Sequence, residues 1–410
     1  MMRGSIAFLA LLSPYAANDA RATTGENVPH HYQAGEFANL ARELHKAIDA
    51  SAYGTPNAEA LRGDTLKIVA ARIAGADVNV LRRPENAAGL LALVLCGAGT
   101  QTLSRVLEDD HWVENDRVLG RGLLALSVRN LEEAKSFFAK VDRQVLPVAV
   151  RASLALAEAK MFADSDPKRA ILQLQEARIG VPGTGLEEAA LRQQIIILLR
   201  LGDSKKAGER MSAYLRRFPQ STYWDSFKTL IVGMAGKHGT ITAADFLMPS
   251  VAVNVAEGSN RYRAFLVALS GRLLLTGALA HAAALADFVC RTEPEQSDLR
   301  RRAELYKRAA GISVQTAQVS VAALEALDVR RYTPAEQQLI RAAIIVARDV
   351  EGGFSDASAS KYDAAPPAAR KALGANEMDP AAESPLGGNL VAHAEKSLKE
   401  AQKSLSGIGP

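Results

Sequence analysis

Apolar residues recur three or four positions apart along most of this chain, the spacing that gives an α-helix one apolar face. In residues 32–50, for example, they stand at Phe37, Leu40, Leu44 and Ile48. No sustained run alternates apolar and polar residues with a period of two, as a half-buried strand would. We therefore predict an all-α protein. Besides those in 118–219, we expect helices over 32–50, 57–73, 84–97, 100–107, 221–234, 260–277, 278–291, 298–310, 314–327 and 334–350, with a loop over 108–116.

Residues 118–219 hold three copies of one helical pattern. The copies are Val118, Gly122, Ala134, Phe138 and Pro147; then Leu154, Glu158, Ala170, Leu174 and Pro182; then Leu191, Ile195, Ala207, Met211 and Pro219. The alanines are 36 and 37 residues apart, and a period of about this length is typical of tetratricopeptide-like helix pairs. We expect the alanine where two helices cross, the larger residue in the space between units, and the proline at the end of the second helix. Such a solenoid offers an extended surface for other proteins.

Residues 182–187 predict the start of a helix in the third copy. Thr184 and Glu187 stand three apart before an apolar run, which is the spacing of a capping box, and Pro182-Gly183 before them favours a turn. The expected N-caps of three later helices are Ser297, Ser313 and Thr333, the last with Pro334 and Glu336.

The first 22 residues resemble a secretory signal. Arg3 supplies a positive charge, residues 5–15 form a short apolar run, and Ala20-Arg21-Ala22 fits a cleavage site. A short, uncleaved N-terminal anchor is the alternative. We expect a chain exported to the periplasm, with residues 23–351 as a helical-repeat domain.

Composition changes after this domain. Residues 352–389 are rich in Ala, Pro, Gly and Ser, which predicts a flexible linker. Residues 390–405 predict a C-terminal amphipathic helix that docks on the body of the protein or on a partner.

Charge and cysteine content limit the function classes. The formal net charge is +4 over 410 residues, and basic runs such as 300–302 have no interleaved aromatic residues, which argues against nucleic-acid binding. Cys96 and Cys290 each end an apolar run, so they are either one disulfide of an exported protein or two buried thiols.

The chain shows no motif for a cofactor, a metal or catalysis. It has no glycine-rich phosphate loop, no His-Glu-x-x-His motif and no nucleophile elbow. His111, Glu114 and Asp116 lie close together, but we interpret them as a solvated acidic loop. Glu187 and Glu188 are adjacent on a helix and point in different directions, so they cannot flank one bond. We predict a protein that is not an enzyme and needs no cofactor.

Residues 182–192 carry a family resemblance. The run PGTGLEEAALR is similar to the P-G-T-x-x-E-E-A-A-L-R signature of the MotC family, periplasmic flagellar-motility proteins of alphaproteobacteria. The flanking sequences AILQLQEARIGVPG and AYLRRFPQSTY agree with it too. Gly185 stands where we expect a larger apolar residue, a change that loosens the turn but leaves the cap intact.

The resemblance implies an auxiliary protein of the flagellar motor that is needed for rotation and binds the periplasmic part of the stator protein MotB. We assign structural roles to the motif residues Pro182, Gly183, Thr184, Glu187, Glu188 and Leu191. Arginine is favoured at protein interfaces, so we expect Arg192, Arg216 and Arg217 to be exposed and to contact the partner.

Two other functions fit the helical pattern. One is a tetratricopeptide-like periplasmic adaptor in envelope assembly or secretion. The other is a cell-wall lytic enzyme with a helical superstructure, for which the chain leaves no room for a compact catalytic domain.

Overall fold

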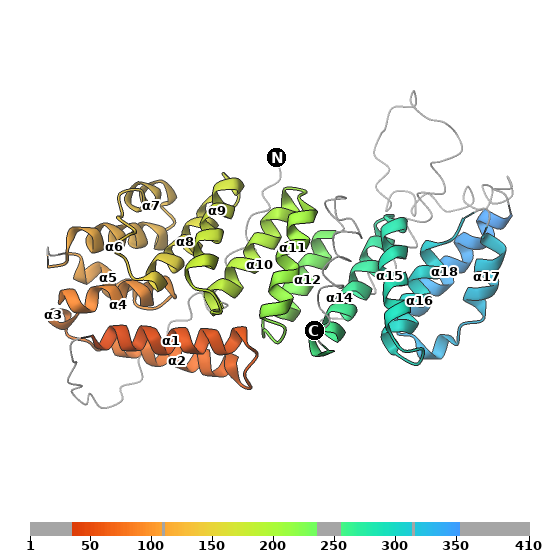
Figure 1. The fold of residues 1–410 in the computed structure, drawn as a ribbon, viewed down its shortest axis with the longest axis horizontal. Helices are drawn as coiled ribbons and strands as arrows, with labels where there is room; N and C mark the ends of the chain where they lie inside the picture. Colours follow the sequence, from red (N-terminus) through yellow and green to blue (C-terminus); the bar gives the residue numbers. More distant parts are fainter. Residues whose placement is uncertain (1–34, 109–110, 236–255, 314–315, 353–410) are drawn as a thin grey trace, which may run out of the picture. The chain divides into compact units, whose positions relative to one another are not determined.

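The computed structural model describes residues 35–108, 111–235, 256–313 and 316–352, and every regular element in these ranges is a helix (Figure 1). The all-α prediction is therefore confirmed. The chain divides into two compact units, residues 1–228 and 229–410. The predicted signal, nearly all of the linker and the C-terminal helix lie outside the described residues, so the expected domain boundaries stay predictions.

Unit 1 is built from consecutive helices that pack in neighbouring pairs. They are α1 (Glu36–Ala52), α2 (Ala58–Ala74), α3 (Val78–Leu81), α4 (Pro84–Leu95), α5 (Thr100–Val106), α6 (Glu114–Ser127), α7 (Leu131–Phe138), α8 (Val148–Phe162), α9 (Pro167–Gly180), α10 (Gly185–Arg200) and α11 (Ser204–Arg217), after which α12 (Trp224–Ala235) begins. The apolar pattern does not predict α3, because four residues are too few to show a helical period.

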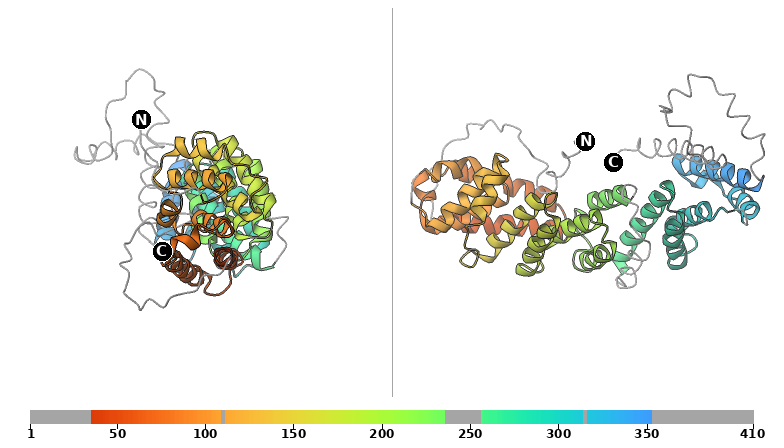
Figure 2. Two further views of the ribbon diagram at one scale, coloured as in Figure 1. Left: turned by 90° about the vertical axis from the view of Figure 1, so that its left-hand side faces the viewer. Right: turned by 90° about the horizontal axis from the view of Figure 1, so that it is seen from above.

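The three sequence repeats are the helix pairs α6/α7, α8/α9 and α10/α11. Figures 1 and 2 show these pairs following one another in unit 1. The predicted crossing residues Ala134, Ala170 and Ala207 are fully buried, and so is the third filling residue, Met211. In the first pair a side chain on Gly122 would collide with the ring of Phe138, so glycine lets that ring lie on α6. The helical-repeat prediction is confirmed.

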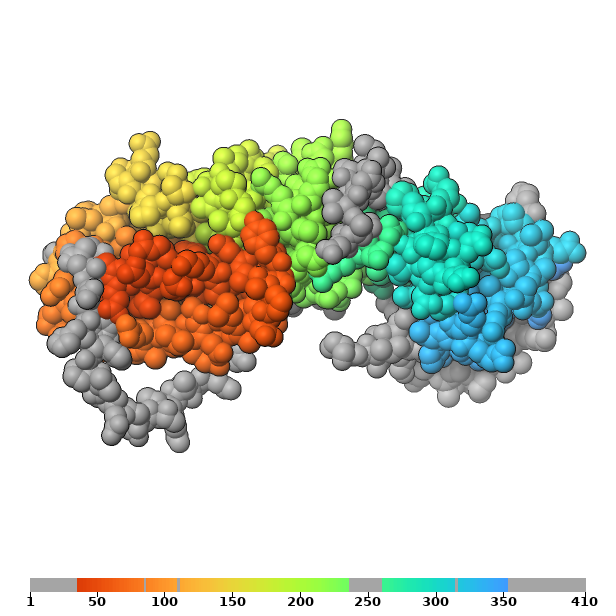
Figure 3. Space-filling view, turned by 60° about the horizontal axis from the view of Figure 1, so that its bottom comes forward, coloured from red at the N-terminus to blue at the C-terminus, as the bar shows by residue number. Residues whose placement is uncertain are grey.

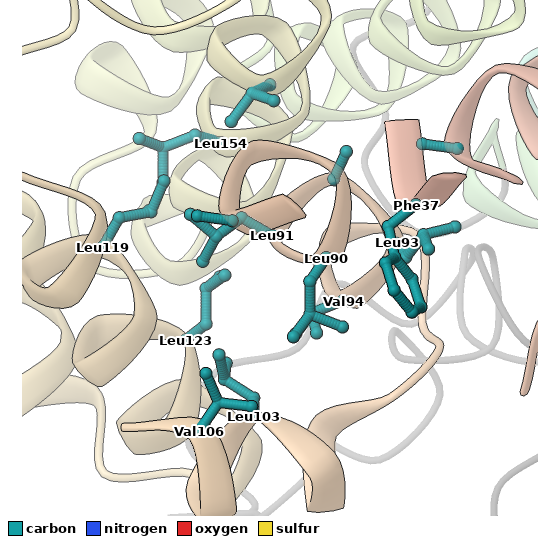
Figure 4. Close-up of a cluster of buried hydrophobic side chains, with 14 of the residues drawn as sticks. Phe37, Leu90, Leu91, Leu93, Val94, Leu103, Val106, Leu119, Leu123 and Leu154 are labelled. Carbon is teal, nitrogen blue, oxygen red and sulfur yellow. The ribbon is translucent and has the colours of Figure 1, made fainter. Parts of the chain in front are cut away.

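An apolar core of unit 1 lies where α1 and α4 meet the first two repeats (Figure 4). Phe37, Leu90, Leu103, Leu119 and Leu154 contribute to it, and none of these side chains has solvent-accessible surface. One apolar core therefore joins Phe37 of α1 to Leu154 of α8, which lies more than a hundred residues later in the chain.

Helix α1 lies along the repeats and contacts α2, α4 and α10. In the space-filling view α1 and α2 form a continuous surface beside the repeat helices (Figure 3). A Cβ on Gly89 of α4 would stand 2.4 Å from the backbone nitrogen of Ala38 in α1. Only a glycine at that crossing allows the two backbones to approach so closely.

The predicted loop over 108–116 ends earlier than expected, because α6 begins at Glu114. Trp112 in this connection is buried, and its indole N–H donates to the carbonyl oxygen of Leu81 at 3.2 Å. The tryptophan thus fixes the connection onto α3.

Unit 2 repeats the same design with α14 (Ala256–Leu275), α15 (Leu279–Thr292), α16 (Asp298–Ala310), α17 (Ala317–Glu325), the 3₁₀ turn η2 (Val329–Arg331) and α18 (Pro334–Glu351). Thr333 and Glu336 form the predicted capping box, and Ser297 caps α16 by accepting from the N–H of Leu299 at 3.2 Å. The expected cap Ser313 is wrong. Thr316 accepts from the N–H of Ser313 and donates to the carbonyl oxygen of Gly311, so the turn closes on Thr316 and α17 starts after it.

Candidate functional site

The family motif forms the corner between α9 and α10. Thr184 is the N-cap of α10, and its hydroxyl oxygen accepts from the N–H of Glu187 at 3.4 Å. The Glu187 carboxylate reaches back to the N–H of Gly183 at 2.7 Å. Gly183 has a φ of +77°, in the left-handed region that favours glycine, and exposed Pro182 precedes it. Thr184 caps α10 as expected, but Glu187 accepts from the N–H of Gly183, one residue before the N-cap, so the two residues close the corner without forming the expected capping box.

Helix α1 holds this corner from the outside. The Tyr53 hydroxyl donates to the carbonyl oxygen of Gly183 at 2.7 Å, and the N–H of Gly185 donates to the Asp49 carboxylate at 2.6 Å. A Cβ on Gly185 would come within 2.6 Å of the Ile48 side chain and 2.9 Å of its carbonyl oxygen. Glycine therefore stands where a larger residue is expected because α1 occupies the space.

Glu188 lies at the centre of a buried polar network. Its carboxylate accepts the Nε–H of Arg192 at 2.8 and 2.9 Å, the Tyr214 hydroxyl at 3.1 Å and the Ser221 hydroxyl at 2.8 Å. Burial, together with the negative charge of Glu188, raises the pKa of Tyr214 well above its ordinary value. The neighbouring Leu191 is fully buried. Glu188 thus has different partners from Glu187, as expected from their opposite directions on the helix.

The prediction that Arg192 is exposed is wrong, because its side chain is only 3% exposed. The Glu188 carboxylate one turn earlier pairs with it, and its guanidinium lies 4.4 Å from the centre of the Tyr223 ring. Burial acts to lower the pKa of Arg192, but the charge and hydrogen bond of Glu188, together with Tyr214 and Tyr223, outweigh burial, so the pKa is raised. Arg192 is held inside the unit rather than presented to a partner.

The other two predicted contact residues lie at the end of α11 and are exposed. Arg217 forms an ion pair with the buried carboxylate of Glu187, and Arg216 donates to the Ser212 hydroxyl at 3.3 Å. Their contact with a partner stays a prediction.

Two further arginines join Arg217 on this surface. Arg178 of α9 is half-buried, and its pKa is lowered by burial and by the positive charges of Arg210 and Arg217 in α11. We call Arg178, Arg210 and Arg217 the arginine patch. In the described part of the chain no carboxylate pairs with Arg178 or Arg210, and the Nε of Arg178 has no hydrogen-bond partner. The patch therefore has unbalanced positive charge.

Sequence reasoning missed Arg178 and Arg210. One signal was available, because Arg210 and Arg217 are seven residues apart and share one side of their helix. The position of Arg178 beside them depends on how α9 packs in the stack, which the linear pattern does not give.

The structure also brings together His45, Asp49 and Cys96, which the sequence does not suggest. The sulfur of Cys96 lies 3.5 Å from Nε2 of His45. Burial raises the pKa of the Cys96 thiol to about 12 and lowers the pKa of His45, while Asp49 is bound to the N–H of Gly185. A thiol with that pKa has almost no thiolate at neutral pH, so this group is not an activated nucleophile.

The two cysteines are free thiols in the structure, so the disulfide alternative is not the one observed. Cys96 lies in unit 1 and Cys290 in unit 2, where Cys290 is buried in α15. The other alternative, two separate thiols at the ends of apolar runs, describes them.

The acidic segment around His111 has local partners. Glu114 forms an ion pair with Arg117, and burial raises the pKa of Asp116. Within the ranges that the structure describes, no three His, Cys, Asp or Glu side chains gather where they could hold a metal ion.

Comparison with known proteins identifies the family. The family described as "Chemotaxis protein MotC" matches residues 2–410. This chain belongs to the MotC family. It is 25% identical over 397 residues to the "Chemotaxis protein MotC" of Rhizobium meliloti (strain 1021), an alignment that covers 93% of this chain and 87% of that protein. No solved structure matches the chain.

Membership of the MotC family connects the chain with flagellar motility, in an accessory role. The resemblance drawn from residues 182–192 is thereby confirmed. In the described part of the chain no helix has both the length and the apolar character that crossing a membrane requires.

Proposed function

We propose that this protein is a non-catalytic accessory protein of the flagellar motor that acts in the periplasm by binding the periplasmic part of the stator protein MotB. Its membership of the MotC family supports a motility role. The signal-like residues 1–22 support export. Stacked helix pairs supply a continuous surface of the kind that binds proteins.

The observation that carries the binding proposal is the arginine patch. Arg178 and Arg210 lack a carboxylate partner in the described structure, and Arg217 adds a third positive charge beside them. Bringing like charges together costs free energy, which a partner's carboxylates would recover on binding. Arginine also pairs with carboxylates through two parallel hydrogen bonds, which suits a protein partner with acidic side chains.

A binding measurement tests this proposal. Residues 23–410 are titrated against the purified periplasmic part of MotB from the same organism. The test variant is Arg178→Glu with Arg210→Glu, which leaves Arg217 in place because Arg217 pairs with the buried Glu187. We expect Kd to rise at least about tenfold, since each close charge pair contributes on the order of 1 kcal/mol or more.

The matched control is Arg105→Glu with Arg121→Glu, two exposed arginines on α5 and α6 that pair with no carboxylate in the described part of the chain. It changes the net charge equally and should alter Kd less than about threefold. Equal weakening by both variants would show that only net charge matters. No binding by the unchanged chain would contradict MotB as the partner.

A further inference from the structure

A pocket of about 350 Å³ lies between α8 and α9. It is lined by Arg143, Gln144, Arg151, Glu176, Ile179 and Gly180. Arg143 and Gln144 come from the connection before α8, Arg151 from the first turn of α8, and the others from the end of α9. Its volume falls in the range of sites that hold a few side chains or a small ligand.

Arg143 forms a fixed wall of this pocket. It makes an ion pair with the buried carboxylate of Glu158 and donates to Gln173 at 2.9 Å and to Glu176 at 3.0 Å. These contacts use its charge and hold its guanidinium in place. Arg143 therefore shapes the pocket, but its positive charge is already balanced by Glu158 and Glu176 and is not available to a ligand.

Arg151 supplies the available charge. It is half-buried, and no hydrogen bond or ion pair satisfies it in the described part of the chain. A guanidinium in such a hollow binds a carboxylate in preference to water, because the surrounding protein weakens solvent screening.

We call Val145, Val148 and Ile179 the rim, because Ile179 lines the pocket, Val148 lies against the lining residue Gly180, and Val145 follows the lining residue Gln144. Val145, Val148 and Ile179 are 65%, 45% and 64% exposed. A Cβ on Gly180 would lie 3.8 Å from the Val148 side chain, which places Val148 over the end of α9. Folding leaves these three large apolar side chains in water beside the hollow that Arg151 lines, as expected of a protein-contact surface.

We propose that this pocket receives an acidic side chain, with an adjoining apolar side chain on the rim, from an extended segment of the partner protein. The carboxylate pairs with Arg151, and the apolar side chain covers Val145, Val148 and Ile179. The inference rests on the proposed function, since it assigns the segment to MotB. Arg178 of the patch and Ile179 of the rim are consecutive residues of α9.

Photo-cross-linking in cells tests the pocket with the full chain. A photo-cross-linking amino acid replaces Val145, and the same amino acid replaces Val128 in a control, because Val128 is also exposed, at the C-cap of α6. Helix α6 contributes no residue to the lining of the pocket, which makes Val128 a suitable control position. Each chain is produced in a strain that lacks the native copy. Mass spectrometry then identifies the cross-linked peptide.

We expect position 145, and not position 128, to cross-link to an acidic segment of the periplasmic part of MotB. Arg151→Gln should reduce that yield at least fivefold, whereas Arg105→Gln, a matched exposed arginine, should leave it unchanged within twofold. Unchanged circular dichroism and tryptophan fluorescence in both variants show that the fold is kept.

The outcomes separate this inference from the proposed function. An Arg151-dependent cross-link to an acidic segment of a different protein would retain the pocket but contradict MotB. Cross-links to residues 353–410 of the same chain or to a second copy would overturn the inference, as would no cross-link at position 145 or a yield that ignores Arg151.

Discussion

Folding disfavours the charge of Lys160. Burial lowers its pKa to about 8, and the positive charge of Arg192 adds to this effect. No carboxylate pairs with Lys160 in the described structure. The unfolded lysine has a higher pKa, so the unfolded chain binds more protons between about pH 8 and 10.5 and stability rises with pH in that window.

Lys160→Met should therefore stabilise unit 1 by about 1 to 3 kcal/mol at pH 7, because it removes a buried charge and keeps the apolar stem. The gain should be much smaller at pH 9.5, where folded Lys160 is already largely neutral. Urea unfolding followed by tryptophan fluorescence measures this directly, since both tryptophans, Trp112 and Trp224, lie in unit 1.

Lys168→Met is the control, because Lys168 is exposed at the start of α9. Its effect should be small and nearly equal at both pH values. An equal gain from Lys160→Met at pH 7 and 9.5 would show that its charge is not disfavoured by folding.

At the residue scale, the sequence predicts hydrogen bonds between neighbouring residues better than it predicts which side chains are exposed to solvent. Thr184 and Glu187 are three residues apart, and their capping contact depends on little else. Arg192 is different, because its burial requires Glu188 on the same helix and Tyr223 from a segment about thirty residues later. From the sequence alone, a charged residue is predicted to be exposed, because the partners that allow its burial are not evident.

At the scale of elements the contact of α1 with the start of α10 determines the shape of the motif corner. Asp49 accepts from the first N–H of α10, where a negative charge is favourable. Gly185 provides the space for this approach. The motif is thus joined to a helix that precedes it by more than a hundred residues.

Gly185→Ala should destabilise unit 1 by about 1 to 3 kcal/mol, because the added methyl group meets the side chain and the backbone of Ile48. Gly63→Ala is the matched control, since Gly63 lies within α2 and a Cβ there meets nothing within 4 Å. It should be neutral or raise stability by up to about 1 kcal/mol. Equal effects of the two substitutions in urea unfolding would refute the close approach of α1.

Helix positions were largely predictable, and helix partners were not. Apolar periodicity and capping residues locate α16 and α18 within a few residues. The very short α3 has no period to detect, and the start of α17 depends on the turn that Thr316 closes. The packing of α1 against α10 could not be predicted, because the sequence of neither helix indicates which helix it packs against.

At the scale of the whole molecule, the family match extends over both units, while the arginine patch and the pocket both belong to unit 1. Within that unit both include residues of α9, the second helix of the second repeat. The repeats could be predicted from the sequence, but this surface could not, because Arg151, Arg178 and Arg210 come from three different helices.

The accessory role in the flagellar motor is tested by measuring the swimming of a clean deletion strain and counting its flagellar filaments by microscopy. We predict that the cells keep a normal number of filaments but stop or slow, and that the unchanged gene restores swimming. Normal swimming by the deletion strain would contradict an accessory role in the motor.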